Sequence, residues 1–305
     1  MGARPVNRDT FSGFHPLVNM SYFVVVIGFA MFFMHPVSLA ISIVASFTYA
    51  VYLNGKRVVR MGFIFMLPMI ILTSVLNPLF NHGGVTILAY LPNGNPVTLE
   101  SIMYGIAASI MLVTVISWFS CFNAVMTSDK FVYLLGRIIP ALSLILSMSL
   151  RFVPRFMAQI KIVSNAQKCI GRDVTSGNIL QRARHGIKIL SIMVTWALEN
   201  SIETADSMKS RGYGLPGRTA FSIFRFNRRD GWAMAYILTC AAAIIAGAVL
   251  EVYRFRYFPT IRHISGDWHM FWTVLLFVIY FVLCIFPIIV NIKEDLIWKR
   301  IKSKI

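Results

Sequence analysis

Charge, and above all negative charge, is scarce in this sequence. Charged residues make up 13% of 305 positions and hydrophobic residues 57%, which is too little charge to cover a soluble globule of this size. The 29 Lys and Arg outnumber the 12 acids, for a net charge of +17. No stretch has the composition of a soluble basic domain, so this charge does not indicate a nucleic-acid-binding protein. A lipid bilayer is the natural solvent for such a chain.

Several signatures of catalysis and of metal binding are also missing. The sequence has no phosphate-binding loop of the form G-x-x-x-x-G-K-[ST], so nucleotide hydrolysis must come from elsewhere. Its six histidines are scattered without acidic companions, which argues against an intramembrane metalloenzyme. The four cysteines lie far apart and predict neither a disulfide framework nor a metal site. Catalytic residues and a metal site are therefore not expected.

Membrane spans are predicted by six uncharged stretches, each about as long as the ~20 residues that cross the hydrocarbon as a helix. They cover residues 17–34, 37–53, 61–79, 101–126, 232–250 and 268–292. Lys56, Arg57 and Arg60 follow the second stretch, whereas residues 80–99 contain no Lys or Arg. The positive-inside rule therefore predicts a cytoplasmic N-terminus.

Carboxylates are absent from these predicted spans. Glu100 is the one acid between residues 10 and 128, and it lies just before the fourth span. Proton- and sodium-coupled carriers usually place carboxylates within the membrane, because the cost of burying them there is borne for function. A stand-alone secondary transporter of a small solute is therefore the alternative function and not the preferred one.

Residues 131–150 are apolar enough to form another span. A crossing there would place every Lys and Arg between Arg151 and Arg229 outside, and Arg137 at a depth where a central arginine costs ~3 kcal/mol. We therefore expect a helix at or just below the membrane surface. The chain is predicted to be all-α and polytopic with five to six spans: a four-span region (1–126), a basic cytoplasmic segment (127–230), and one or two spans with a basic tail (231–305).

Two amphipathic helices are predicted in the cytoplasmic segment. The first covers residues 152–170 and ends at Gly171, and the second covers 188–211 and ends at Gly212. We expect the two glycine-terminated tips, with their basic residues, to lie at nearby points. The second helix has an apolar stripe, opposite to which lie Glu199, Glu203 and Asp206. These acids are expected either to pair with Arg151 and Arg155 or to contact a partner.

Several short motifs resemble the transmembrane T component (EcfT/CbiQ-like) of energy-coupling-factor importers. They are His15-Pro16-Leu17-Val18, His35-Pro36, Thr98-Leu99-Glu100, Tyr104-Gly105 and the run from Ser147 to Pro154. The most specific likeness is Asp206-Ser207-Met208-Lys209-Ser210-Arg211-Gly212-Tyr213, which resembles the second of two Ala-Arg-Gly-like motifs in that family. The first motif departs from the pattern, because Ile170 stands where its arginine is expected.

This resemblance implies a non-catalytic subunit in the cell membrane of a bacterium or archaeon. It implies three partners besides the lipid bilayer: two ABC-type ATPase subunits, which bind ATP and Mg, and one membrane-embedded substrate-binding S component for a vitamin or a metal ion. Docking to the ATPases is implied for Ser210, Arg211 and Gly212 at the second motif and for Lys168, Ile170, Gly171 and Arg172 at the first. There either Arg172 or Lys168 supplies the charge, or the contact is apolar. Contact with the S component and between helices is expected from Ile138, Leu142, Ile145, Met148, Phe152 and Met157.

Overall fold

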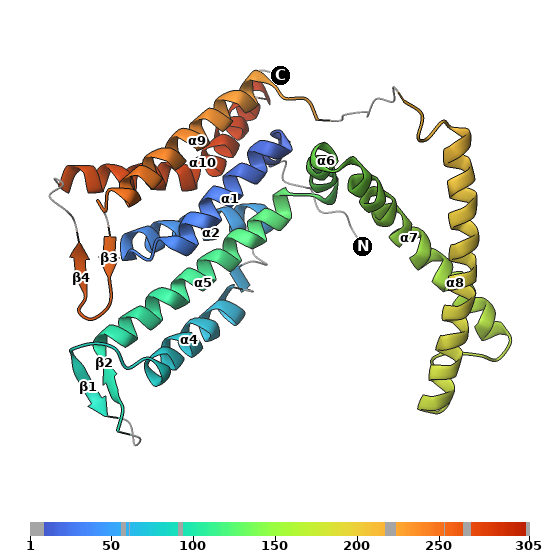
Figure 1. The fold of residues 1–305 in the computed structure, drawn as a ribbon, viewed down its shortest axis with the longest axis horizontal. Helices are drawn as coiled ribbons and strands as arrows, with labels where there is room; N and C mark the ends of the chain where they lie inside the picture. The colour runs from blue at the N-terminus through green and yellow to red at the C-terminus, as the bar shows by residue number, and fades with distance from the viewer. Residues whose placement is uncertain are drawn as a thin grey trace. The chain divides into compact units, whose positions relative to one another are not determined.

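The computed structural model describes residues 9–55, 59–60, 62–90, 94–216, 224–252, 254–264 and 270–302. These residues form long helices with two short β-hairpins (Figure 1). The chain divides into two compact units, Met1–Phe131 with Phe224–Ile305, and Val132–Ile223. We call the first the membrane unit and the second, built around α7 and α8, the hairpin unit.

The membrane unit contains most of the elements. In chain order they are η1 (Phe11–Gly13), α1 (Pro16–Phe32), α2 (Pro36–Asn54), the π-helical turn η2 (Gly62–Met66), α4 (Leu67–Phe80), β1 (Ile87–Tyr90), β2 (Pro96–Thr98), α5 (Leu99–Val125), α9 (Arg228–Val249), β3 (Arg254–Arg256), β4 (Arg262–Ile264) and α10 (Met270–Lys302). The helix α6 (Ser128–Ile138) begins in this unit and continues into the hairpin unit, which contains α7 (Pro140–Cys169) and α8 (Ile179–Ser210).

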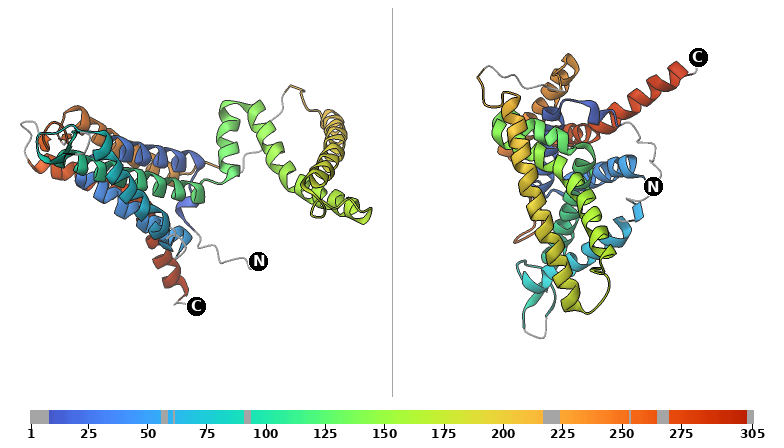
Figure 2. Two further views of the ribbon diagram at one scale, coloured as in Figure 1. Left: turned by 90° about the horizontal axis from the view of Figure 1, so that it is seen from below. Right: turned by 90° about the vertical axis from the view of Figure 1, so that its right-hand side faces the viewer.

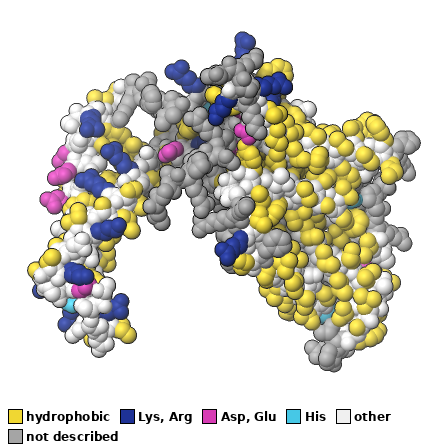
Figure 3. All heavy atoms as spheres, turned by 180° about the vertical axis from the view of Figure 1, so that it is seen from behind, with side chains coloured by type: hydrophobic (Ala, Val, Ile, Leu, Met, Phe, Trp, Pro, Cys, Tyr) yellow, Lys and Arg dark blue, Asp and Glu magenta, His cyan; other side chains and the backbone are white. Residues whose placement is uncertain are grey.

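Within the described residues, each of the six predicted spans coincides with helix, and the all-α polytopic class is confirmed. By length and composition α2, α5, α9 and α10 can cross a membrane, and α1 and α4 are apolar but shorter. By the same criteria α7 is also long and apolar enough to cross a membrane. It continues without a break through the residues where the sequence suggests two separate helices. Apolar side chains cover the face of the membrane unit seen in Figure 3, whereas the hairpin unit carries interspersed basic and acidic side chains.

The two His-Pro motifs start the first two helices. Nδ1 of His15 accepts a hydrogen bond from Leu17 N at 3.2 Å, and Nδ1 of His35 accepts one from Val37 N at the same distance. In each helix proline occupies the first helical position, where its missing N–H is not needed. These histidines are therefore helix caps, which explains their position in front of an apolar run.

The core of the membrane unit surrounds α1. Tyr22 and Phe23 of α1 are fully buried, and Tyr22 donates its hydroxyl to Cys284 O of α10 at 3.0 Å. Trp118 of α5 is also fully buried and donates its indole N–H to Ser42 Oγ of α2 at 3.0 Å. These bonds link four helices and satisfy polar groups that hydrocarbon could not solvate.

Close packing of α4 on α5 depends on a small residue. A Cβ added to Gly105 of α5 would lie 2.9 Å from Asn77 Cβ and 3.0 Å from Ser74 O of α4, so a larger side chain would push the helices apart. Four residues further along α5, the hydroxyls of Ser109 and Thr73 share a hydrogen bond of 2.6 Å. The Tyr104-Gly105 motif therefore marks a helix contact.

The hairpins β1–β2 and β3–β4 are antiparallel and lie in the loops before α5 and α10. The sequence reveals turn formers in the first of these loops but not the strands, which are three or four residues long. Tyr257, just after β3, donates its hydroxyl to Met34 O at 2.8 Å. The β3–β4 loop is thereby tied to the short connection between α1 and α2.

Candidate functional site: the two tips and the groove of the helical hairpin

The C-terminal tip of α8 is built by its backbone. Tyr213 N donates to Met208 O at 3.0 Å and Gly212 N donates to Lys209 O at 2.9 Å, which together form a Schellman motif. Gly212 has φ +76°, a left-handed conformation that strains any residue with a side chain. The glycine therefore ends the helix and leaves Arg211, the last residue before it, exposed at the tip.

The C-terminal tip of α7 has the same construction. Arg172 N donates to Gln167 O at 2.9 Å and Gly171 N donates to Lys168 O at 3.0 Å, and Gly171 has φ +77°. The two motifs can therefore be superposed residue by residue, and Ile170 occupies the position that Arg211 occupies in α8. Ile170 is 60% exposed, so an isoleucine is presented where the other tip presents a guanidinium.

The two cations of the α7 tip differ in their surroundings. Lys168 Nζ lies 3.3 Å from Asp173 Oδ2. Hydrogen bonds from Thr175, together with the Lys168 ammonium, hold the pKa of the Asp173 carboxyl below its usual value, so this pair persists at neutral pH. Arg172 is exposed on the other side of the glycine. Of the two candidates for the missing charge, Lys168 is thus already engaged within the tip.

The tips lie at opposite ends of the hairpin and not at nearby points, so that expectation from the sequence was wrong. Phe156 of α7 contacts Trp196 of α8 with ring centroids 5.4 Å apart, and Val163 further along α7 packs with Ile189 earlier in α8. The helices are therefore antiparallel, as Figure 2 also shows. Because a helix rises 1.5 Å per residue, the 32 residues of α8 separate the two tips by ~45 Å.

A groove of about 700 Å³ runs between the helices next to the α8 tip. Arg151 and Arg155 line it from α7, and Glu203 and Arg211 line it from α8. Three guanidiniums and one carboxylate give it a positive charge. The structure thus brings together residues that the sequence analysis assigned to separate roles.

The predicted charge pairs are not close contacts in this groove. Among the described residues, neither Arg151 nor Arg155 has a carboxylate oxygen within 4.0 Å, whereas Lys168 and Asp173 form an ion pair within that distance. Arg155 instead lies over the Trp196 ring, with Cζ 5.6 Å from its centroid. Glu199 and Asp206 are exposed and do not line the groove. Pairing of these five residues stays a prediction.

Large apolar side chains are exposed along the hairpin. Of the six residues assigned to S-component and inter-helix contact, four are exposed: Ile138, Leu142, Ile145 and Met157. Met148 and Phe152 are half-buried and line the groove. On α8 an exposed row follows with a spacing of four residues: Leu190, Val194, Leu198 and Ile202. Exposed apolar surface of this extent indicates contact with a membrane or another protein.

A cluster of polar residues that was not predicted from the sequence holds the N-terminal segment. Lys130, 5% exposed, donates from Nζ to Ser12 O at 2.6 Å and to Val125 O at 2.9 Å. Asn19, with its amide oriented by its neighbours, accepts from Lys130 Nζ at 3.1 Å. Lys130 lies at the start of α6, one residue before the chain leaves the membrane unit.

The N-terminal segment also contacts the start of α9, just after the chain re-enters the membrane unit at Phe224. Asp230, near the start of α9, accepts from His15 N at 3.0 Å, and Arg229 lies 4.0 Å from the centroid of the Phe14 ring. Asn291 of α10 accepts from Thr10 N at 2.8 Å and donates to Asp9 at 2.6 Å. We call residues 9–15 with Lys130, Asp230 and Asn291 the N-terminal clasp. Two members of the clasp, Asp9 and Asp230, are acids, which are rare in this sequence. That rarity is the signal by which the sequence could have pointed to these two residues.

Within the described ranges, no group of three or more His, Cys, Asp or Glu side chains could hold a metal ion. The chain is a polytopic helical membrane protein whose inserted helical hairpin presents two exposed tips. The model of the cobalt transport protein family CbiQ matches residues 12–222 of it. The chain therefore belongs to this family, as the motifs indicated, and the match covers the whole hairpin unit except its last residue.

Curated relatives agree with this assignment. Over 98 residues the chain is 39% identical to the energy-coupling factor transporter transmembrane protein EcfT of Streptococcus thermophilus, covering 32% of this chain and 37% of that protein. It is 30% identical over 105 residues to EcfT of Lactobacillus helveticus, covering 34% and 38%. A longer match, 26% identical over 196 residues, covers 61% of this chain and 72% of EcfT of Bacillus selenitireducens. The first two matches thus span less than two fifths of the relatives' length.

Proposed function

We propose that this chain is the non-catalytic membrane scaffold of an energy-coupling-factor importer, and that its two hairpin tips dock two ABC-type ATPase subunits. The observation that carries the proposal is the duplicated tip: two Schellman motifs of the same geometry, at opposite ends of one helix pair and ~45 Å apart. A single small protein does not contact two such points, whereas two subunits can each take one. ATP and Mg bind to those subunits and none to this chain.

Arg211 is the principal contact of the α8 tip. Its side chain is exposed, and the glycine that follows ends the backbone there, so the guanidinium can enter an acidic cleft on the ATPase without a steric clash from the chain. Ser210 and Gly212 shape this contact. At the α7 tip, Ile170 supplies an apolar contact and Arg172 supplies the cation. Lys168 is not the cation of this contact, because it already pairs with Asp173 in the same tip.

The exposed apolar side chains of the hairpin form the surface for the S component. Leu142, Ile145 and Met157 on α7 are exposed despite their size, and burial against a membrane-embedded partner removes that surface from water. Methionine adapts its shape, which suits a surface that repacks as the partner reorients. The transported solute, a vitamin or a metal ion, is bound by that partner.

The complex lies in the cytoplasmic membrane of a bacterium or archaeon, with the N-terminus of this chain and the hairpin unit in the cytoplasm. This orientation rests on the basic residues of the connection before α4, of which Arg60 is exposed, and on the lack of Lys and Arg in residues 80–99. It places both tips on the side of the membrane where ATP is available.

The test is co-purification of the ATPases with the affinity-tagged full chain from its native host. Arg211→Glu is expected to lower the yield of ATPase about tenfold or more, since losing one partner of a buried interfacial charge pair costs about 2–5 kcal/mol. The matched control is Arg256→Glu, an exposed arginine of β3 in the membrane unit and outside both tips, which is expected to leave the yield unchanged.

An unchanged yield from the Arg211→Glu variant would contradict the docking role. Ile170→Arg gives a second readout, because an arginine at the equivalent position of the α7 tip is expected to raise the yield or leave it equal, and never to lower it. Uptake of a solute by the purified chain alone, in vesicles without ATP, would overturn the scaffold function and support a secondary transporter.

A further inference from the structure

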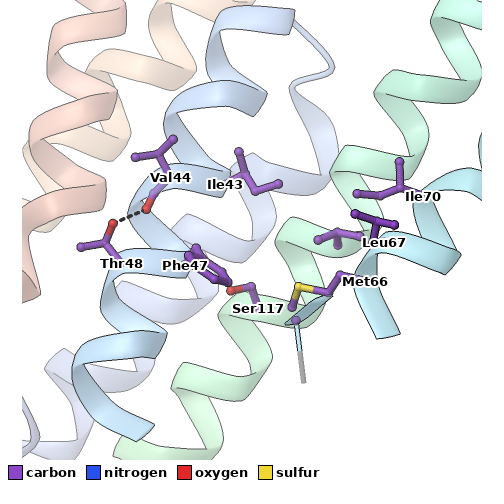
Figure 4. Close-up of a pocket in the computed structure, with 10 residues that line it drawn as sticks. Ile43, Val44, Phe47, Thr48, Met66, Leu67, Ile70 and Ser117 are labelled. Carbon is purple, nitrogen blue, oxygen red and sulfur yellow. Dashed lines mark hydrogen bonds between the residues drawn. The ribbon is translucent and has the colours of Figure 1, made fainter. Parts of the chain in front are cut away.

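A pocket of about 350 Å³ lies between α2, η2, α4 and α5, within the membrane unit. Phe47 of α2, Met66 of η2 and Val113 of α5 form much of its wall, which is almost entirely apolar (Figure 4). Its volume is within the range of small-molecule and cofactor sites. One wall contains a π-helical turn, a rare element that is frequent at functional sites.

The pocket opens toward the surroundings of the helices. Val44 of α2 and Leu67 of α4 line it and are 61% and 49% exposed, and both belong to helices predicted to lie in the bilayer. Large apolar side chains at the rim are solvated by lipid and not by water. A molecule that enters therefore comes from the membrane.

One polar group inside the pocket has no hydrogen bond. Ser117 of α5 is 2% exposed, lines the pocket, and its Oγ has no partner among the described residues. Thr48, in the same wall, donates to Val44 O of its own helix at 2.7 Å, as hydroxyls in apolar surroundings usually do (Figure 4). An unpaired hydroxyl in hydrocarbon is costly, so Ser117 Oγ is available to donate to an acceptor on the entering molecule.

A cation lies close to the pocket along the chain. Arg60 is exposed and precedes Gly62, which lines the pocket, by two residues. Thr48, six residues before the end of α2 at Asn54, also lines the pocket. The site therefore combines an apolar chamber and one hydrogen-bond donor with a positive charge close by in the chain. A glycerophospholipid offers the complementary sequence of groups: acyl chain, ester carbonyl and phosphate.

We propose that this pocket binds one phospholipid of the leaflet nearer to Arg60. One acyl chain occupies the space between Phe47, Met66 and Val113, its ester carbonyl accepts a hydrogen bond from Ser117 Oγ, and its phosphate lies near Arg60. The bound lipid fills the space between α2 and α4 and so fixes the distance between these two helices. This site is separate from the docking tips, and it does not depend on which partner binds them.

The experiment uses the full chain in vesicles of phosphatidylethanolamine and phosphatidylglycerol that contain a phosphatidylglycerol with a diazirine on one acyl chain. After illumination, mass spectrometry locates the lipid adducts on peptides. Adducts are expected on the peptides that contain Phe47 and Met66, and they are expected to be lost in Ser117→Phe, whose ring occupies the chamber. Leu112→Phe is the control: it lies on the same helix, is exposed and lies outside the pocket wall.

A second variant tests the carbonyl bond in a protein whose packing is nearly unchanged. The wild-type chain is expected to retain ester-linked over ether-linked phosphatidylglycerol about fivefold, the effect of one hydrogen bond, and Ser117→Ala is expected to abolish that preference. Equal adducts in Ser117→Phe and Leu112→Phe would mean that only annular lipid is labelled, and would overturn the proposal. Adducts that vanish when partner chains co-purify would assign the pocket to a partner helix instead, and equal retention of ester and ether lipid by the wild type would refute the carbonyl contact.

Discussion

Replacing Lys130 by methionine is expected to destabilise the membrane unit by about 3–5 kcal/mol, although methionine keeps much of the apolar stem. Lys130 is 5% exposed, and its ammonium satisfies Ser12 O, Ser12 Oγ and Val125 O at 2.6, 2.9 and 2.9 Å. Each buried acceptor left unpaired costs about 1–3 kcal/mol. Ser12 O and the Asn19 side-chain oxygen lose the ammonium as donor, whereas Val125 O keeps a longer hydrogen bond from Ser12 Oγ at 3.4 Å. Removing a cation that interacts with Asp9 adds to this cost.

The assay is thermal unfolding of the full chain in mild detergent, followed through tryptophan fluorescence, since Trp118 is fully buried in the same unit. A loss of about 4 kcal/mol corresponds to a Tm lower by roughly 10 °C. The control is Lys293→Met, an exposed lysine on α10 of the same unit, which is expected to leave Tm within about 1 °C. If the Lys130→Met variant unfolds at the same temperature as this control, the clasp does not hold the N-terminal segment.

Three further outcomes follow from the same structure. Burial lowers the pKa of Lys130 to about 8, and Asp9 opposes the shift. Between pH 8 and about 10 the unfolded chain therefore binds more protons than the folded chain. The stability of the wild type relative to Lys130→Met should thus rise with pH over this interval, as measured by unfolding at a series of pH values. Asn291→Leu should couple to Lys130→Met by about 1 kcal/mol or more in a double-mutant cycle, because both side chains hold one segment. Gly212→Ala should destabilise the last turn of α8 by about 1–2 kcal/mol, which is measured as faster hydrogen exchange of that turn. Gly171→Ala should cost less. Its added Cβ meets no atom within 4 Å, whereas that of Gly212 lies 3.2 Å from a leucine side chain.

The spans and the ends of the hairpin helices could be predicted from the sequence because both depend on local patterns. Twenty-residue apolar stretches need no tertiary information, and glycines such as Gly171 and Gly212 end helices through their own backbone freedom. The continuous α7 was harder to predict. Pro140 starts this helix at its first position, where proline is favoured, and the helix continues past Pro154 without a break.

The side of α8 that packs on α7 could not be read from the periodicity. Its apolar residues occupy more than one face: Leu190 and Val194 form a regular stripe and are exposed, whereas Ile189 and Met193 are buried against α7. A helix with apolar residues on two faces has no single preferred orientation until its partner is known. The clasp could not be predicted for a different reason, because its bond between Thr10 and Asn291 joins residues 281 positions apart.

The placement of the two tips at opposite ends of one helix pair limits how the hairpin unit could respond to the two subunits proposed to dock there. Neither helix can shorten appreciably, since each carries an unbroken ladder of backbone hydrogen bonds apart from the turn around Pro154. If two docked subunits approach each other, the hairpin must therefore tilt or bend as a body, and the change must be absorbed where the chain enters and leaves it. Both of these points are held by the N-terminal clasp, through Lys130 on one side and Asp230 on the other. On the proposed function, weakening a clasp that anchors both connections to one short segment is therefore expected to reduce ATP-driven uptake into vesicles more than it reduces the yield of co-purified ATPase.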